Sequence, residues 1–186
     1  MKIYQLKITL KNISPTIWRR VEVQSDINLD DLSRVILNVM GWYGGHLMIF
    51  EIGRREFYFD KESAHQFDGI LMSKARLNKY LTAPKDKAKF TYDFGDDWQH
   101  NVVLEKILDP EPGATYPRCT AGKRKCPPED CGGPWAYAGI LEALKDPDKT
   151  KNKELLEWVG DDYDPEAFSV EWANGRMERT IINDLL

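Results

Sequence analysis

The chain has 186 residues, 42% of them hydrophobic and 30% charged, a composition that supports one well-filled core rather than two separate ones. Its 26 basic and 30 acidic residues give a net charge of −4, which excludes a general attraction for nucleic acid or anionic lipid. No apolar run approaches the roughly 18 residues that suggest a membrane span, and the N-terminus lacks the apolar segment of a signal peptide. We therefore expect a single cytoplasmic domain over residues 1–186 that does not enter a membrane.

The first third of the chain predicts the order strand, strand, helix, strand, strand. Residues 3–10 alternate apolar and polar side chains, and a second strand at 17–23 follows the turn signal NISPT, so the two form a hairpin. A helix follows, capped by Asp26 or Asn28 and stopped by Gly41, with its apolar residues spaced for one buried face. The segments HLMIFEI and REFYFD then predict two more strands. This order is typical of an α+β fold with a helix across one face of a sheet.

The rest of the chain predicts an added hairpin and a helical C-terminal part. SKARLNKYL is expected to be a short helix, and KFTYDF with WQHNVVLEKI predicts two strands around the turn GDD. This hairpin either extends the sheet or begins a second layer. PWAYAGILEALKD, NKELLEWV and NGRMERTIINDLL carry the helical signals of the C-terminal third.

All three cysteines lie in the segment CTAGKRKCPPEDCGGPW. Its glycines and prolines argue against a core helix or strand, so burial of the thiols as small hydrophobic residues is not expected. Three cysteines cannot all pair within one chain, and a cytosolic setting disfavours disulfides. Structural zinc takes four tetrahedral donors, so we predict a zinc ion held by Cys119, Cys126, Cys131 and His100. His46 is the alternative to His100 as the fourth donor.

Two alternatives apply to the same segment. A catalytic cysteine needs a lowered thiol pKa and a base, which Cys131 near a predicted helix start and His100 would supply. Three reduced thiols without a ligand role are the other alternative. The segment YDFGDDWQH is equally open: its carboxylates, Asp93, Asp96 and Asp97, suit a divalent metal or acid–base chemistry, and they also suit a tight turn between strands.

The compact basic residues of the chain lie in the cysteine segment or directly before it. Arg118, Lys123, Arg124 and Lys125 are the residues that we expect to contact a partner protein or nucleic acid, and a solvated loop is the alternative.

Several segments together resemble the plasmid pRiA4b Orf-3-like family, which also includes insertion-sequence passenger proteins called TnpR. They are SPTIWRRVEV, MGWYGGHLMIFEIG, YDFGDDWQHNVVLEKI, YPRCTAGKRKCPPEDCGGPWAYAGILEAL and YDPEAFSVEWANG. The resemblance implies an α+β fold and an association with plasmids and mobile elements, but no particular activity. Where the family often has His-Leu-His, this chain has His46, Leu47 and Met48. No serine- or tyrosine-recombinase constellation accompanies the TnpR resemblance.

These observations predict a binding or assembly protein with a zinc-ordered loop, rather than an enzyme. One alternative is a metal-dependent hydrolase that uses Asp97 or Glu129 as its base. The other is a nucleic-acid-binding protein that acts through the basic loop.

Overall fold

The computed structural model describes residues 1–146, 148–160 and 162–183, and it confirms the α+β class. Eight strands form one sheet in the order β5-β4-β3-β6-β7-β1-β2-β8. Neighbouring strands are antiparallel except for the short parallel pair β4 and β5. The strands are β1 (Ile3–Leu10), β2 (Trp18–Gln24), β3 (Met48–Ile52), β4 (Arg55–Tyr58), β5 (Ile70–Leu71), β6 (Lys87–Tyr92), β7 (Trp98–Leu108) and β8 (Arg118–Lys123).

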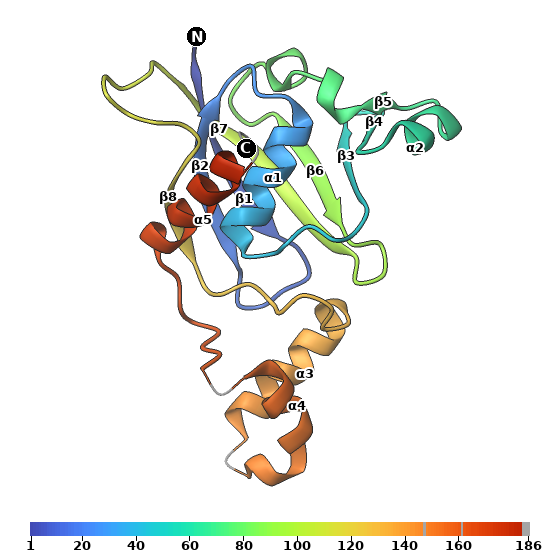
Figure 1. The fold of residues 1–186 in the computed structure, drawn as a ribbon, viewed down its shortest axis with the longest axis vertical. Coiled ribbons are helices and arrows are strands. Elements are labelled where there is room, and N and C mark those ends of the chain that lie inside the picture. Colours follow the sequence, from blue (N-terminus) through green and yellow to red (C-terminus); the bar gives the residue numbers. More distant parts are fainter. Residues whose placement is uncertain (147, 161, 184–186) are drawn as a thin grey trace.

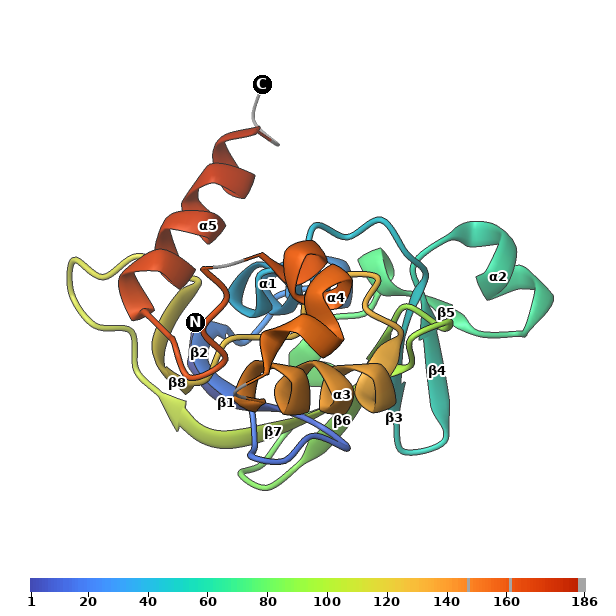
Figure 2. The same ribbon diagram turned by 90° about the horizontal axis from the view of Figure 1, so that it is seen from below.

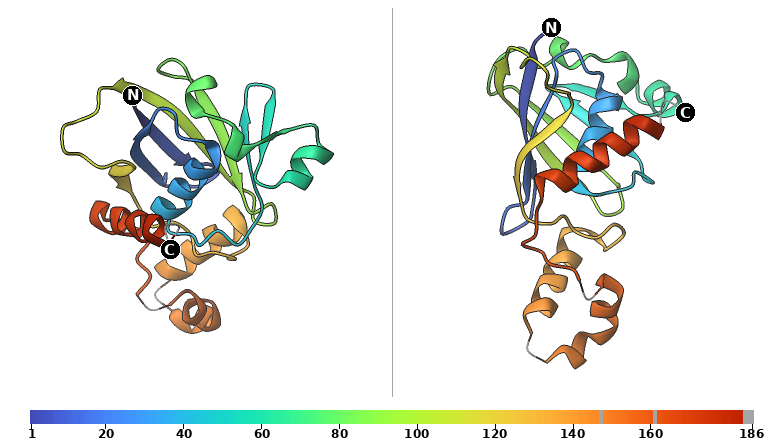
Figure 3. Two further views of the ribbon diagram at one scale, coloured as in Figure 1. Left: turned by 45° about the horizontal axis from the view of Figure 1, so that its top comes forward. Right: turned by 60° about the vertical axis from the view of Figure 1, so that its left-hand side comes forward.

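Helices α1 and α5 cover one face of this sheet, while α3 and α4 form a separate lobe below it (Figure 1, Figure 3). The opposite face carries half-exposed polar side chains, as the alternation along β1 shows. The view from below shows α3 and α4 side by side across the end of the sheet (Figure 2). The helices are α1 (Leu29–Met40), α2 (Lys61–Gln66), α3 (Gly133–Lys145), α4 (Lys153–Val159) and α5 (Val170–Asn183), with 3-10 turns at Met72–Lys74, Leu77–Lys79 and Lys149–Asn152.

Helix α1 has the ends that the sequence predicts. The Asn28 side chain accepts a hydrogen bond from the Asp31 amide at 2.9 Å, which satisfies one of the unpaired N–H groups of the first turn. Gly41 ends the helix with φ of 104°, a conformation that glycine adopts without steric cost. The apolar face of α1 is buried against the sheet, so this helix fixes where the following loop, residues 41–47, leaves the core.

The hairpin of β6 and β7 extends the sheet and does not form a second layer. It lies in the middle, with β6 paired to β3 and β7 paired to β1 along nearly its whole length. The turn between these two strands, residues 93–97, therefore emerges at the end of the sheet beside the loop that follows α1.

The cysteine segment differs from the prediction. Its first part is β8, which pairs with β2 through a register shift, and both Cys119 and Cys126 are buried in the hydrophobic core. The segment can enter the core because Gly122 leaves room for Phe168, whose ring lies 2.5 Å from the place of a Cβ at that position. The expectation that these thiols are not buried as small hydrophobic residues was therefore wrong for two of the three.

Two smaller differences concern the region between β4 and β6. SKARLNKYL forms two 3-10 turns rather than one helix, and α2 with β5 was not predicted. Among the described helices, none has both the length and the apolar character that crossing a membrane requires.

Candidate functional site

The four predicted zinc donors are not brought to one point. Among the described residues, no three of Cys119, Cys126, Cys131 and His100 have ligand atoms within 4.8 Å of one another. His100 lies on the buried face of β7, where its Nδ1 is 3.2 Å from the carbonyl oxygen of Phe90. Burial lowers the pKa of His100 to about 4, so the ring is neutral and shielded from solvent.

Each of the three thiols has its own surroundings. The Cys126 Sγ lies 3.0 Å from the Met40 Sδ and 3.5 Å from an Arg19 nitrogen. Cys119, on β8, has its Sγ 3.6 Å from the Ala121 carbonyl oxygen. Burial raises the pKa of Cys126 to about 11, and burial together with the Asp96 carboxylate raises that of Cys131 to about 12. Thiols with raised pKa values are mostly protonated near neutrality, which is the opposite of what a catalytic cysteine requires.

A different set of donors does converge, from three loops at one end of the sheet. Among the described residues, His46, Asp93 and Asp130 form the group whose ligand atoms all lie within 4.8 Å. The His46 Nε2 is 2.9 Å from an Asp130 carboxylate oxygen, and its Nδ1 is 3.7 Å from one of Asp93. His46 ends the loop after α1, Asp93 begins the turn after β6, and Asp130 lies in the loop between β8 and α3.

The turn holds the Asp93 carboxylate in a fixed position. Asp93 is buried and has φ of 56°, and its Oδ1 accepts hydrogen bonds from the Gly95 amide at 2.9 Å and the Asp96 amide at 3.3 Å. Aspartate tolerates this left-handed conformation better than most residues. The turn interpretation of YDFGDDWQH is therefore right, and the same turn leaves the second oxygen of Asp93 facing His46.

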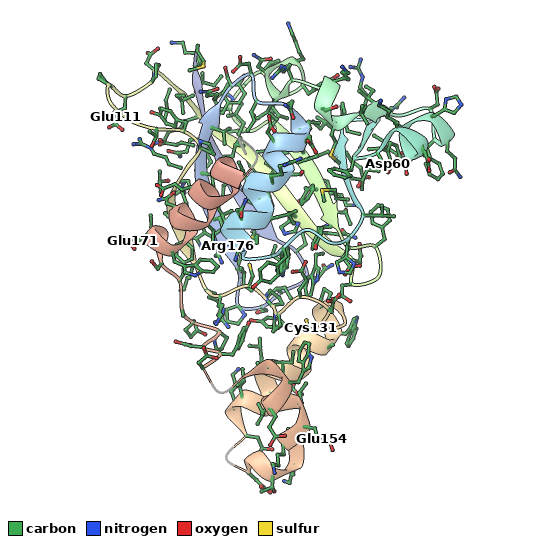
Figure 4. The ribbon with its side chains drawn as sticks, viewed as in Figure 1. Asp60, Glu111, Cys131, Glu154, Glu171 and Arg176 are labelled. Carbon is green, nitrogen blue, oxygen red and sulfur yellow. The ribbon has the colours of Figure 1, made fainter. Side chains whose placement is uncertain are left out.

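The loop that carries Asp130 is fastened to that turn. The Gly132 amide donates to an Asp96 carboxylate oxygen at 3.1 Å. Gly133 approaches so closely that a Cβ there would lie 2.5 Å from the Asp96 carbonyl oxygen, and its φ of 79° also favours glycine. Figure 4 shows Cys131, between these residues and Asp130, at the start of α3 where the lobe meets the sheet.

Glu129 ties the third loop to the other two. One of its carboxylate oxygens accepts the Tyr92 hydroxyl, and the other accepts the Tyr43 amide at 2.9 Å. Burial and the hydrogen bond to Glu129 both raise the pKa of Tyr92. The Tyr92 hydroxyl therefore keeps its proton at ordinary pH values and donates a hydrogen bond to Glu129. The residue next to Asp130 therefore has a structural task.

The predicted basic contact residues divide into two kinds. The two arginines are already paired with carboxylates. Arg118 forms salt bridges with Glu22 at 2.7 Å and with Glu111 at 2.6 Å, and buried Arg124 forms one with Glu166. The remaining pair, Lys123 and Lys125, is exposed. The four cations therefore do not form one continuous basic surface.

Each loop of the converging group also exposes an apolar side chain. Leu47 follows His46, Phe94 follows Asp93, and Trp135, which is 91% exposed, lies shortly after Asp130. Single exposed apolar side chains are common on protein surfaces, whereas several close together can mark a contact surface. Leu47 and Phe94 therefore lie in ligand-bearing loops, and Trp135 lies at the start of the helix that follows the third loop.

Sequence reasoning noted His46 and Asp93 separately but missed Asp130 and the grouping. Each residue lies in a glycine-rich or acidic turn, and turn formation alone accounts for such residue types. The available signal was the presence of one imidazole and several carboxylates in three loops that each follow a predicted sheet or helix end.

The fold and this group of residues together define an α+β protein with a candidate divalent-metal site at the end of its sheet. Residues 2–172 match the family described as plasmid pRiA4b ORF-3-like protein, and the chain belongs to that family. It is 37% identical over 181 residues to the uncharacterized protein y4hQ of Sinorhizobium fredii, a match that covers 95% of this chain and 91% of the relative. The crystal structure of the protein of unknown function MM3350 from Methanosarcina mazei is similar, with a TM-score of 0.85 and 40% identity over 91% of this chain and 96% of that one.

Proposed function

We propose that this protein is a protein-binding module whose contact surface is organised by a divalent metal ion at His46, Asp93 and Asp130. The observation that carries the proposal is the convergence of three ligand atoms from three loops within 4.8 Å. The burial of Asp93 adds to it, because a buried carboxylate needs a compensating partner and His46 is the group that its second oxygen faces.

The donor set suggests which metal to test. Imidazole nitrogen suits zinc, and carboxylate oxygen suits manganese and magnesium, so zinc and manganese are the first candidates. Bound zinc has its nitrogen and carboxylate oxygen ligands roughly 2.0–2.2 Å away, so binding requires His46 and the exposed Asp130 to reorient, because the two carboxylates face different nitrogens of the imidazole ring. Three protein donors leave at least one coordination position for water or for a group of the partner.

A binding role is favoured over hydrolysis by the shape of the site. The Asp130 side chain is 70% exposed, so the ion would lie at the surface rather than in a cleft that excludes water. Both residues proposed as the base are engaged: Glu129 holds Tyr92 and Tyr43, and Asp97 holds the Gln99 side chain at 2.8 Å.

A protein is favoured over nucleic acid as the partner. The loops present Leu47, Phe94 and Trp135 beside carboxylates, which repel phosphate, and exposed tryptophan is enriched at the centres of protein interfaces. An association with mobile DNA, which the family resemblance implies, would then depend on a protein partner rather than on direct contact.

The metal site is tested by titration calorimetry of the full chain with zinc and with manganese, after dialysis against a chelator. Asp93→Asn is expected to weaken binding about 100-fold, since changes in groups that only support a ligand already cost 10–100-fold. Asparagine also accepts the left-handed backbone of this position, so the variant changes charge and little else. Asp97→Asn, in the same turn, is the matched control and should bind as the wild type does.

The binding role is tested by affinity capture with the wild type, Asp130→Asn and Trp135→Ala, each with zinc and with chelator. Proteins retained by the wild type with zinc, and lost with either variant or with chelator, would support the proposal. Exposed His65 supplies the control variant, His65→Ala, which should retain them. Equal affinity of wild type and Asp93→Asn for both metals would overturn the metal site. Capture of the same proteins with zinc and with chelator, and by the wild type and both variants alike, would overturn the binding surface.

A further inference from the structure

Arg19 is a buried cation whose charge no carboxylate balances among the described residues. It lies on β2 and is 1% exposed. Its Nε donates to the Val39 carbonyl oxygen at 2.8 Å, and its Nη1 donates to the carbonyl oxygens of Trp18 at 2.8 Å and Lys123 at 3.0 Å. These acceptors are neutral, and a buried charge is costly unless it is paired with an opposite one.

The second terminal nitrogen of Arg19, Nη2, has an N–H group that is not used in the hydrogen bonds above. Among the described residues the hydrogen-bond partner of Nη2 is the Cys126 Sγ at 3.5 Å, and sulfur is a weak acceptor. A guanidinium group has five N–H donors, and the bonds described here use four of them. Arg19 can therefore still donate one strong hydrogen bond.

Arg19 lines a cavity of about 420 Å³, within the size range of small-molecule sites. The cavity lies between the segment that follows β8 and the segment that leads into α5, which are joined by a hydrogen bond from the Lys125 amide to the Pro165 carbonyl oxygen at 3.1 Å. Its lining includes Arg19, Met40, Lys125, Ala167, Phe168 and Trp172.

Two glycines leave the space that the aromatic rings of this cavity occupy. The Phe168 ring stacks on the Arg19 guanidinium at 4.3 Å, and a Cβ at Gly122 would lie 2.5 Å from that ring. A Cβ at Gly41 would lie 2.9 Å from the Trp172 ring. The cavity is thus lined by two aromatic rings, and Arg19, which is itself buried, also belongs to its lining.

The carboxylates near this cavity in sequence have other partners. Glu166 is paired with buried Arg124. Glu171, labelled at the start of α5 in Figure 4, accepts the Ser169 hydroxyl at 2.8 Å. Neither of these side chains is left to balance Arg19.

We propose that this cavity binds a small organic acid, a monocarboxylate with an apolar body. Its carboxylate would accept the remaining N–H of Arg19, and its body would pack between Met40, Phe168 and Trp172. Lys125, which lines the same cavity and whose Nζ lies 4.8 Å from the centroid of the Tyr163 ring, adds attraction for an anion. This site is separate from the proposed metal site, so either can be absent without the other.

The test is titration calorimetry of the full chain with octanoate, 4-phenylbutyrate and 2-naphthoate, each compared with its neutral primary amide. At least one acid is expected to bind ten-fold or more tightly than its amide. Equal binding of acid and amide, or no binding by any of the three acids, would overturn the proposal.

Variants locate the binding. Ala167→Phe places a ring in the mouth of the cavity from an exposed position and should abolish binding. Lys125→Gln should weaken acid binding about 3- to 10-fold, whereas Lys123→Gln, an equal change of charge on an exposed lysine outside the cavity, should not. These variants avoid removing Arg19, which could prevent folding. Acid binding that Ala167→Phe and Lys125→Gln both leave unchanged would place it elsewhere and overturn the proposal.

Discussion

Two regions of this molecule gather side chains that bind metals in other proteins, and they differ in their contact with water. Cys119 and Cys126 lie in the core near the Arg19 cation, where burial raises the pKa of both thiols. His46 and Asp130 lie at the surface, and the nearby Asp93 is held by two backbone amides. A thiol kept protonated in a buried site acts as a packing group, whereas carboxylate oxygens that reach the surface are open to a cation from solvent.

The largest expected effect concerns the dry region. The folded chain keeps His100 neutral down to pH about 4, whereas the unfolded chain binds a proton at the ordinary pKa of 6.5. Below pH 6.5 the unfolded state therefore holds more protons, and His100 alone lowers the free energy of unfolding by about 3 kcal/mol between pH 6.5 and 4.

Urea unfolding at several pH values measures this slope, and His100→Phe, which keeps an aromatic ring beside Phe90 and Trp42, should flatten it. His65→Gln, at an exposed position outside both regions, is the control variant. An unchanged slope in His100→Phe would mean that the ring reaches solvent.

Gly133→Ala tests the fastening of the surface site. It places a Cβ against the Asp96 carbonyl oxygen and forces alanine into a left-handed conformation, which costs about 1–3 kcal/mol of folding stability for the conformation alone. Zinc affinity should fall as well, because the loop of Asp130 moves away from Asp93. Gly45→Ala, in open space at ordinary φ, is the matched control for urea unfolding and for calorimetry, and equal effects of the two variants would contradict the fastening.

Cys126→Ser separates the two regions. A hydroxyl group in the apolar contact with Met40 should lower the free energy of unfolding by about 1–2 kcal/mol, while the zinc content stays the same. The four-donor prediction with Cys119, Cys126, Cys131 and His100 requires stability and zinc content to fall together. Denaturant unfolding and elemental analysis of one preparation distinguish these outcomes.

The smallest effect is expected for Asp130→Asn without metal. The side chain is exposed and asparagine also accepts φ of 59°, so stability should change by less than about 0.5 kcal/mol. The rise in melting temperature that zinc gives the wild type should be lost in this variant. A large loss of stability without metal would make Asp130 a structural residue instead.

Local patterns in the sequence predict much of this fold. Asn28 and Gly41 define the ends of α1, and the alternation in residues 3–10 and 98–104 defines central strands. That same alternation places His100 on one face with Trp98, Val102 and Leu104, all buried, so its distance from a surface zinc site could have been inferred.

Other features depend on contacts that local sequence does not contain. β8 has no clear alternation, and its place in the sheet depends on Phe168 covering Gly122. The grouping of His46, Asp93 and Asp130 depends on the strand order, which brings the turn after β6 beside the loop after α1.

The central position of β1 in the sheet also affects when the chain can fold during its synthesis. β1 pairs on one side with β2, which follows at once, and on the other with β7, where Ile3 meets Leu108. While the ribosome is still adding the intervening residues, the second edge of β1 has no native partner and is open to pairing with other strands. Pairing of this edge over its full length requires β7 as far as Leu108, so shorter nascent chains leave part of the edge without its native partner.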